Sequence, residues 1–153
     1  MVQELVDGGT FLLNCAWDME GLEKHLPGQV KAFIANHNIK FYTIDGVKIG
    51  IETGMGPTRI NTILQSAFFK LTGIIPEEQA IDLMKAAAKA TYGRKGDDVV
   101  QKNWAAIDAG AKQVRPVLAD LLFPFKNRPD KFIGCQFLLI LIFPLYALPG
   151  PQS

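Results

Sequence analysis

A glycine-rich loop at residues 54–61 carries the pattern best suited to ligand binding. It reads Gly-Met-Gly-Pro-Thr-Arg-Ile-Asn and runs into a segment with helical periodicity. Backbone N–H groups, the positive end of a helix dipole and the Arg59 guanidinium would together hold a phosphate or a carboxylate. The spacing matches neither the Walker nor the dinucleotide-binding pattern. A tight turn between helices, with Arg59 in a salt bridge, explains the same residues equally well.

Two amide side chains continue from this loop along the predicted helix. Asn61 and Gln65 are four positions apart in the sequence, so they lie on one helix face. A polar strip on an otherwise apolar helix indicates a packed polar interface. This spacing therefore predicts that Asn61 and Gln65 lie at a packed interface.

Polar side chains also follow the two predicted strands. Asn14, Cys15 and Asp45 stand where those strands end, and open α/β sheets bind their ligands at the carboxyl ends of strands. Cys15 follows an apolar strand, which is more typical of a buried small side chain than of a nucleophile.

The remaining titratable groups have simpler explanations. Asp97 and Asp98 could be metal ligands, or half of a motif that holds magnesium and thiamine diphosphate, but a turn with a helix cap explains them better. His25 and His37 have no acid or cysteine at ligand spacing, so solvated or capping roles are expected. We predict no catalytic residue and no metal ligand in this chain.

The elements that position these residues begin as a β-α-β unit. Residues 9–15 form an almost unbroken apolar run, which predicts a strand buried on both faces. Residues 39–45 predict a second strand. The segment between them has helical spacing after Asp18, a candidate N-cap, and Pro27 with Gly28 divides it into two helical pieces. A parallel connection is the strong expectation.

Helices follow the second strand. We predict a short helix at 47–52, a long helix capped by Thr58, a helix at 77–92 behind Pro76, and a last helix at 97–114. The predicted fold class is α/β, a partial Rossmann-like domain with β-α-β followed by several helices. The apolar stripe of the long helix consists of Ile60, Ile63, Leu64, Ala67, Phe68 and Leu71.

The last part of the chain differs in composition from the rest. Six of the nine prolines follow residue 115, which predicts an irregular, proline-rich C-terminal tail. Residues 137–148 are apolar but broken by Pro144, and they are shorter than the roughly 20 residues that span a bilayer. A transmembrane anchor is therefore not expected.

Composition limits the possible functions. The 153 residues, 48% hydrophobic and 20% charged, suit one folded domain. A net charge of +1 points to neither nucleic acid nor an anionic membrane. Two distant cysteines exclude a disulfide framework, a CxxC zinc site and a cluster held by about four thiolates. The N-terminus has no signal-peptide pattern, so a cytoplasmic location is expected.

Several blocks of sequence occur together between about residues 4 and 114. The blocks are GGTFLLNCxW at 8–17, LExxLP at 22–27, IxFYxI at 39–44, RINxIxQSAFFKL at 59–71, IIP at 74–76 and TYGxKG at 91–96. In this order and at these spacings they resemble one known domain, the gamma domain of the pyruvate:ferredoxin (flavodoxin) oxidoreductases.

The resemblance implies a 2-oxoacid:ferredoxin oxidoreductase, which decarboxylates pyruvate on thiamine diphosphate with Mg²⁺. Its electrons pass through [4Fe-4S] clusters to ferredoxin or flavodoxin, and its acyl group passes to coenzyme A. In that family the thiamine and cluster ligands lie in other domains, so we expect no cofactor on this chain alone. The gamma domain is associated with coenzyme A access and domain packing, which assigns Arg59, Asn61 and Gln65 to coenzyme A or an interface. The expected partners are the remaining domains or subunits of the enzyme.

Two features depart from the family. Its gamma domain begins with a glycine-rich turn that should lie upstream of Met1, so residues 1–114 are expected to form only the C-terminal half. Residues 115–153 do not resemble the family. Codons for residues 115–120, read one base further on, can give Val-Pro-Ser-Trp-Gln-Thr, a segment of the expected kind. We hypothesise that residues 115–153 are frameshifted.

Two alternatives stay open. The chain could be a non-catalytic α/β interaction subunit that completes its domain with a separate N-terminal half. It could also be a small module that binds a phosphate or nucleotide at Thr58 and Arg59.

Overall fold

The structure is a computed structural model that describes residues 5–117 and 119–126. Its sheet has the strand order β1-β2-β3. β1 (Thr10–Asn14) and β2 (Lys40–Ile44) pair in parallel along their whole length. β3 (Arg115–Pro116) adds to β2 in the antiparallel direction. The parallel pair confirms the predicted β-α-β unit, and the third strand makes the sheet mixed.

Two helices connect the parallel strands, as predicted. α1 (Met19–His25) begins after Asp18, whose carboxylate accepts a hydrogen bond of 2.8 Å from the Gly21 N–H. α2 (Gly28–Asn36) begins directly after Pro27, which occupies its N-cap position. Proline lacks the N–H needed to continue the first helix, so it separates the two.

One face of the sheet packs against α1 and α2. The Phe11 and Phe41 rings, on adjacent strands, stack with their centroids 5.2 Å apart. Around them lie the buried apolar side chains of both helices and of the C-terminal segment. This first core consists of Phe11, Leu22, Leu26, Phe33, Ile34, Ile39, Phe41, Val117 and Leu122.

β1 is less buried than predicted. Phe11 is buried, but Leu12, Leu13 and Asn14 are only partly covered and Thr10 is exposed. The prediction of a strand buried on both faces is wrong because β1 lies at the edge of the sheet, with β2 as its single neighbour in the described part of the chain. An apolar run marks a strand without specifying its place in the sheet.

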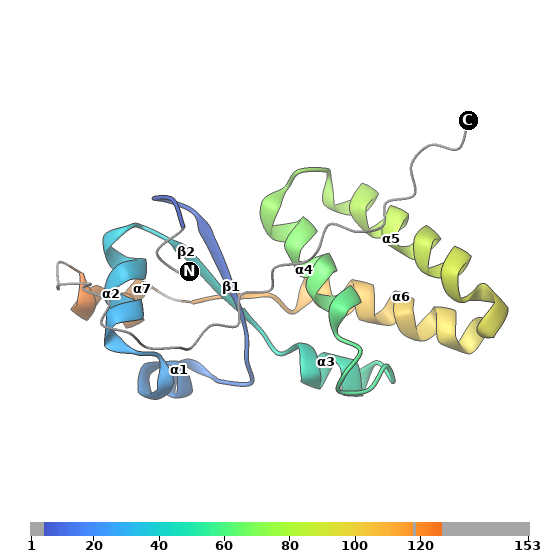
Figure 1. The fold of residues 1–153 in the computed structure, drawn as a ribbon, viewed down its shortest axis with the longest axis horizontal. Coiled ribbons are helices and arrows are strands. Elements are labelled where there is room, and N and C mark those ends of the chain that lie inside the picture. Colours follow the sequence, from blue (N-terminus) through green and yellow to red (C-terminus); the bar gives the residue numbers. More distant parts are fainter. Residues whose placement is uncertain (1–4, 118, 127–153) are drawn as a thin grey trace.

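The helices between residues 46 and 112 lie at one end of the elongated molecule (Figure 1). α3 (Gly46–Glu52) follows β2 directly. α4 (Asn61–Thr72), α5 (Glu77–Tyr92) and α6 (Asp97–Lys112) form a group of packed helices, and the 3₁₀ turn η2 (Gly93–Lys95) joins the last two.

A second core lies where α4 packs on α6. Its buried residues are Ile44, Ile49, Ile63, Leu64, Ala67 and Ala106. Gly110 allows the two helices to approach closely, because a Cβ there would collide with the Ile63 carbonyl oxygen. Ser66, also buried, donates a 2.6 Å hydrogen bond to the Ile107 carbonyl. The predicted stripe on α4 is therefore confirmed at its centre.

Two details of α4 differ from prediction. The helix begins at Asn61 rather than after Thr58, and Ile60 occupies the N-cap position without a side-chain hydrogen bond. A turn at Pro57 and Thr58 comes first and lets the partly buried Ile60 pack against the second core. Phe68 was assigned to the stripe but is 45% exposed. The packing that buries the apolar side chains of α4 ends before the last turn of the helix.

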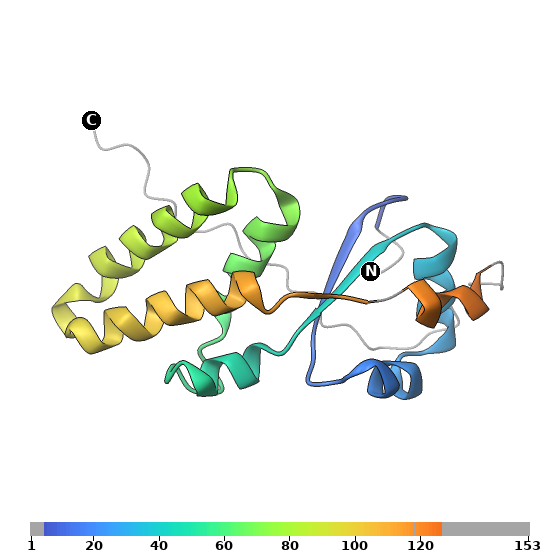
Figure 2. The same ribbon diagram turned by 180° about the vertical axis from the view of Figure 1, so that it is seen from behind.

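The segment after α6 is partly regular (Figure 2). It forms β3, then α7 (Ala119–Leu122) and the 3₁₀ turn η3 (Phe123–Phe125) beside α2. Pro116 can occupy β3 because an edge strand needs no N–H on its outer side. The sequence predicted no regular structure here, and residues 115–125 correct that expectation. Cys135 and the apolar run at 137–148 lie outside the described residues. Among the described helices, none has the length and apolar character required to cross a bilayer.

Candidate functional site

The loop between α3 and α4 turns back on α3. Gly56 has φ +86°, a left-handed conformation that favours glycine. Its N–H donates a 2.8 Å hydrogen bond to the Gly50 carbonyl in α3. This contact holds the loop against α3, so the chain enters α4 at a fixed place with Arg59 just before it. The glycines thus have a structural explanation of their own.

The start of α4 offers free hydrogen-bond donors. Ile60 cannot cap the helix with its side chain, and the first hydrogen bond of the helix runs from the Leu64 N–H to the Ile60 carbonyl. Among the described residues, nothing pairs with the N–H groups of Asn61, Thr62 and Ile63. Unpaired N–H groups and the helix dipole favour an anion at such a terminus by about 0.3–1 kcal/mol when exposed.

Arg59 stands beside this terminus. Its side chain is exposed, and within the described part of the chain it makes no ion pair or hydrogen bond. The salt bridge considered from the sequence is therefore not formed with any described residue. A guanidinium next to free helix N–H groups can bind the oxygens of a phosphate or a carboxylate.

A groove of about 420 Å³ lies between this loop and the turn from α5 into α6. One wall carries Arg59 with the first residues of α4, and the opposite wall carries Lys95. Carboxylates do not line the groove, so its two charged side chains are both cationic. Lys95 Nζ lies 5.6 Å from the centroid of the Tyr92 ring. The complete lining is Met55, Thr58, Arg59, Asn61, Thr62, Tyr92, Lys95, Val99 and Asn103.

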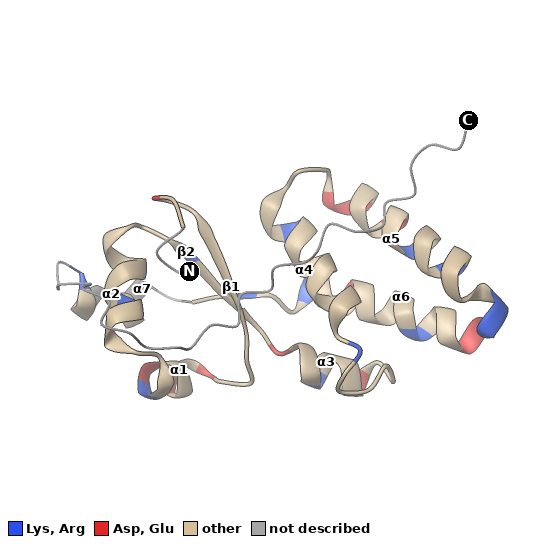
Figure 3. Ribbon diagram, in the orientation of Figure 1, with Lys and Arg blue, Asp and Glu red and all other residues tan. Residues whose placement is uncertain are grey.

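This groove is a local feature, because charge is otherwise mixed over the surface. Figure 3 shows blue and red segments interspersed along the helices, including both signs at the turn between α5 and α6. In that turn, Asp98 forms an ion pair of 2.6 Å with Lys102, while Lys95 faces the groove. An anion would therefore be attracted by the groove residues and not by a large basic surface.

Asn103 lines the same groove from α6 and has an unsatisfied oxygen. The residue is only 2% exposed. Its Nδ2 donates a 2.8 Å hydrogen bond to the Val99 carbonyl, which fixes the orientation of the amide. Its Oδ1 is closed to solvent and has no hydrogen-bond partner among the described residues. Leaving a buried acceptor unpaired costs about 1–3 kcal/mol, so this atom needs an explanation.

The structure separates the three predicted site residues. Arg59 and Asn61 both line the groove, and their role in binding stays a prediction. Gln65 lies one turn further along α4, exposed and outside the groove lining. Lys95 and Asn103 were not predicted as site residues. They reach the groove only through the packing of α4 on α6, which no local sequence signal describes.

A second cavity, of about 600 Å³, lies at the carboxyl ends of β1 and β2. Its polar groups already have partners: Asn14 Oδ1 accepts from the Gly46 N–H at 2.9 Å, and Asp45 Oδ1 accepts from the Lys48 N–H at 2.9 Å. Burial raises the pKa of the Cys15 thiol, against a backbone hydrogen bond at Trp17 that lowers it, and the Asp45 charge raises it further. Cys15 is therefore a weak nucleophile here.

The other candidates take structural roles. Asp97 and Asp98 lie in the first turn of α6, but Gly96 occupies the N-cap position, so the predicted side-chain cap is wrong. The His25 ring stacks on Trp17 at 5.0 Å, and His37 Nδ1 lies 2.6 Å from Asp7 Oδ1. In residues 5–117 and 119–126, His, Cys, Asp and Glu do not gather in threes at any place that could hold a metal. The described residues thus do not fit an iron–sulfur cluster.

Comparison with known proteins identifies the family. The family model "Pyruvate ferredoxin/flavodoxin oxidoreductase" matches residues 2–113. The chain belongs to the pyruvate ferredoxin/flavodoxin oxidoreductase family. This membership confirms the resemblance seen in the sequence blocks.

Three relatives match the chain at 41–48% identity. The pyruvate:ferredoxin oxidoreductase of Moorella thermoacetica is 41% identical over 99% of this chain. The pyruvate-flavodoxin oxidoreductase of Klebsiella pneumoniae is 44% identical over 76% of it. A pyruvate dehydrogenase [NADP(+)] of Cryptosporidium parvum is 48% identical over 71%. The chain spans only 13%, 10% and 6% of these relatives, respectively.

Proposed function

We propose that this chain is part of an enzyme that oxidatively decarboxylates pyruvate with coenzyme A to acetyl-CoA and CO2, and that reduces ferredoxin or flavodoxin. The names of the relatives support this proposal. All three include pyruvate, and they differ in the electron acceptor, which is ferredoxin, flavodoxin or NADP(+). Pyruvate oxidation is therefore the common element, and ferredoxin or flavodoxin is the acceptor that the family's name supports.

We further propose that the groove between Arg59 and Lys95 holds a phosphate of coenzyme A. This proposal rests on the composition of the groove. It is lined by an unpaired guanidinium, free N–H groups at the start of α4 and a second cation, and by no carboxylate. Arg59 and Asn61 would contact the phosphate. Gln65, which is outside the groove, would lie at a domain interface instead. The chain would bind and orient the co-substrate, and it would contribute no catalytic residue.

Thiamine diphosphate, Mg²⁺ and [4Fe-4S] clusters would be held by other parts of the enzyme. The described residues offer no grouping of metal ligands for them, so we derive no reaction step through these groups on this chain. When present, thiamine diphosphate supplies the decarboxylation and the clusters supply electron transfer. The chain's own contribution is binding and packing.

We propose that the partners of this chain are the remaining domains or subunits of the oxidoreductase, and that the complex is cytoplasmic. The small share of each relative that the chain covers supports such partners. So does the structure of β1, whose outer edge has no neighbouring strand in the described residues. An unpaired edge strand favours association with further β structure. An interaction subunit without coenzyme A binding is the second candidate, and the same edge supports it.

The division of the chain at residue 114 is also a proposal. The family model ends at residue 113, whereas the alignment with the Moorella enzyme covers 99% of the chain and so continues beyond this point. Sequencing the coding DNA distinguishes the two views. A family segment in the next frame after residue 114 would support a frameshift. Its absence would make residues 115–153 a genuine part of the protein.

Calorimetric titration of the 153-residue chain with coenzyme A tests the proposed binding. We expect Arg59→Ala to weaken binding by about 10- to 150-fold, because hydrogen bonds to charged groups contribute about 1.5–3 kcal/mol. Arg94→Ala is the matched control, since Arg94 is exposed in η2 and does not line the groove. Equal affinities for wild type and Arg59→Ala would exclude the groove as the phosphate site. Binding by neither would favour the interaction subunit.

A further inference from the structure

Asn103 is a buried polar residue of the groove that the proposed phosphate contacts do not use. Arg59, Lys95 and the start of α4 are hydrogen-bond donors or cations, so they suit the anionic part of a ligand. Asn103 Oδ1 is an acceptor, and phosphate oxygens that are ionised cannot donate to it. On such a ligand, Oδ1 could pair only with a group other than the phosphate.

The amide cannot satisfy itself by rotating. Its Nδ2 is engaged with the Val99 carbonyl at 2.8 Å, one turn earlier in α6. A flip of the amide would place two acceptors, Oδ1 and the Val99 carbonyl, against each other. The orientation with a free Oδ1 is the one that this helix imposes.

We propose that Asn103 determines specificity in the groove by accepting a hydrogen bond from a hydroxyl, amino or amide donor of a phosphorylated ligand. This inference rests on the proposed binding of coenzyme A and adds the class of group that the ligand must carry beside its phosphate. Oδ1 is closed to solvent in the structure, so the donor reaches it when a side chain of the groove moves aside. Tyr92 and Lys95 line the same groove and have rotatable side chains.

Binding of two different ligands distinguishes the role of the Asn103 acceptor from the role of the cations. Coenzyme A carries both phosphates and donors, whereas inorganic pyrophosphate in its ionised form carries only the anion. We expect Asn103→Leu, in the full 153-residue chain, to weaken coenzyme A binding about three- to tenfold, the range for one hydrogen bond. Pyrophosphate binding should not change. Arg59→Ala should weaken both ligands.

Control variants keep the result interpretable. Asn103→Ala also removes Oδ1 and replaces the leucine variant if the larger side chain disturbs α6. Gln101→Leu changes an exposed amide on the same helix, outside the groove, and should leave both affinities unchanged. Circular dichroism and the melting temperature show that each variant is folded before titration.

Titration with fragments of coenzyme A identifies the part of the ligand that carries the donor. Adenosine bisphosphate carries the amino and ribose hydroxyl groups, and phosphopantetheine carries the amides. The fragment whose affinity falls in Asn103→Leu contains the donor. Unchanged affinities for coenzyme A in both Asn103 variants, together with a loss in Arg59→Ala, would overturn the role of Asn103 and leave the phosphate site intact. Absence of any coenzyme A binding to wild type would overturn both proposals.

Discussion

Gly110 of α6 lies directly against the backbone of Ile63 in α4. A Cβ at position 110 would collide with the Ile63 carbonyl oxygen and would lie 3.0 Å from its Cα. Both atoms belong to the backbone of a packed helix, so they cannot move aside as a flexible side chain would. This contact sets how closely α4 approaches α6 at this point.

We expect Gly110→Ala to lower the free energy of unfolding by about 2 kcal/mol. Overpacking costs about 1–3 kcal/mol, which exceeds the 0.5–1 kcal/mol that alanine gains over glycine in a helix. Gly93→Ala is the matched control, because a Cβ there meets no heavy atom within 4 Å and φ is −55°. Urea denaturation monitored by circular dichroism measures both. A Gly110→Ala variant as stable as wild type would contradict the close contact.

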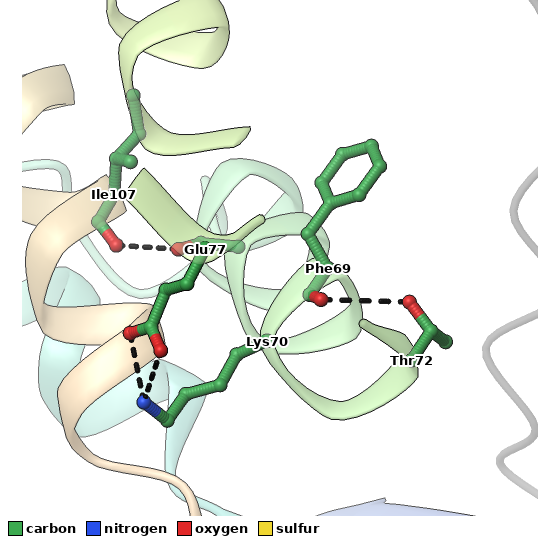
Figure 4. Close-up of polar contacts among 6 residues, drawn as sticks. Phe69, Lys70, Thr72, Glu77 and Ile107 are labelled. Carbon is green, nitrogen blue, oxygen red and sulfur yellow. Dashed lines mark hydrogen bonds and ion pairs between the residues drawn. The ribbon is translucent and has the colours of Figure 1, made fainter. Parts of the chain in front are cut away.

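A buried hydrogen bond joins the same two helices. Ser66 is 2% exposed, and its hydroxyl donates to the Ile107 carbonyl at 2.6 Å (Figure 4). We expect Ser66→Ala to lower the free energy of unfolding by about 1 kcal/mol, since the Ile107 carbonyl can still accept within α6. Thr72→Val removes an exposed hydroxyl that donates to the Phe68 carbonyl at 2.9 Å, and it should change stability by less than about 0.5 kcal/mol. Equal losses in the two variants would show that burial does not strengthen the Ser66 contact.

The sequence predicted the elements well because their signals are local. Asp18 precedes α1 as its cap, Pro27 separates α1 from α2, and Gly93 follows α5. Each of these effects acts within one turn of a helix. The β-branched and aromatic composition of the segment at 39–45 likewise sufficed to predict β2.

Relationships between distant segments were not predictable from the same signals. The contact of Gly110 with Ile63 and the position of Asn103 in the groove depend on how α6 packs against α4 and its preceding loop. The exposure of Phe68 depends on where that packing ends. The glycine-rich pattern pointed to Arg59 and Asn61, which line one side of the groove. The opposite wall of the groove comes from residues more than 30 positions later in the chain.

The cap of α1 gives a third test of stability. Asp18 accepts from the Gly21 N–H at 2.8 Å, and we expect Asp18→Ala to lower the free energy of unfolding by about 1 kcal/mol. Asp18→Asn keeps a capping oxygen and should stay within about 0.5 kcal/mol of wild type, because asparagine and aspartate cap helices about equally well. Thermal melts of the three proteins compare them. If asparagine is as damaging as alanine, the charge of Asp18 matters rather than its hydrogen bond.

The reactivity of Cys15 tests the cavity at the strand ends. Burial raises the pKa of its thiol above the ordinary value of 9.0, against the opposing hydrogen bond at Trp17 and with the Asp45 charge adding to the increase. The thiolate is the reactive form. At about pH 8, we therefore expect iodoacetamide to alkylate Cys15 more slowly in the folded chain than in the urea-unfolded chain. Mass spectrometry in a Cys135→Ser background follows Cys15 alone.

Asp45→Asn should lower the pKa of Cys15 and increase its alkylation rate, because it removes a negative charge while keeping an oxygen that can cap α3. Glu52→Gln is the control: Glu52 lines the same cavity but is not among the groups that shift the Cys15 pKa, so the rate should stay the same. The raised pKa also fixes the sign of its linkage to stability. Its stabilising contribution is complete below the pKa of the unfolded thiol and is lost as pH rises through the higher folded value. A folded chain that reacts as fast as the unfolded one at about pH 8 would contradict the burial of this thiol.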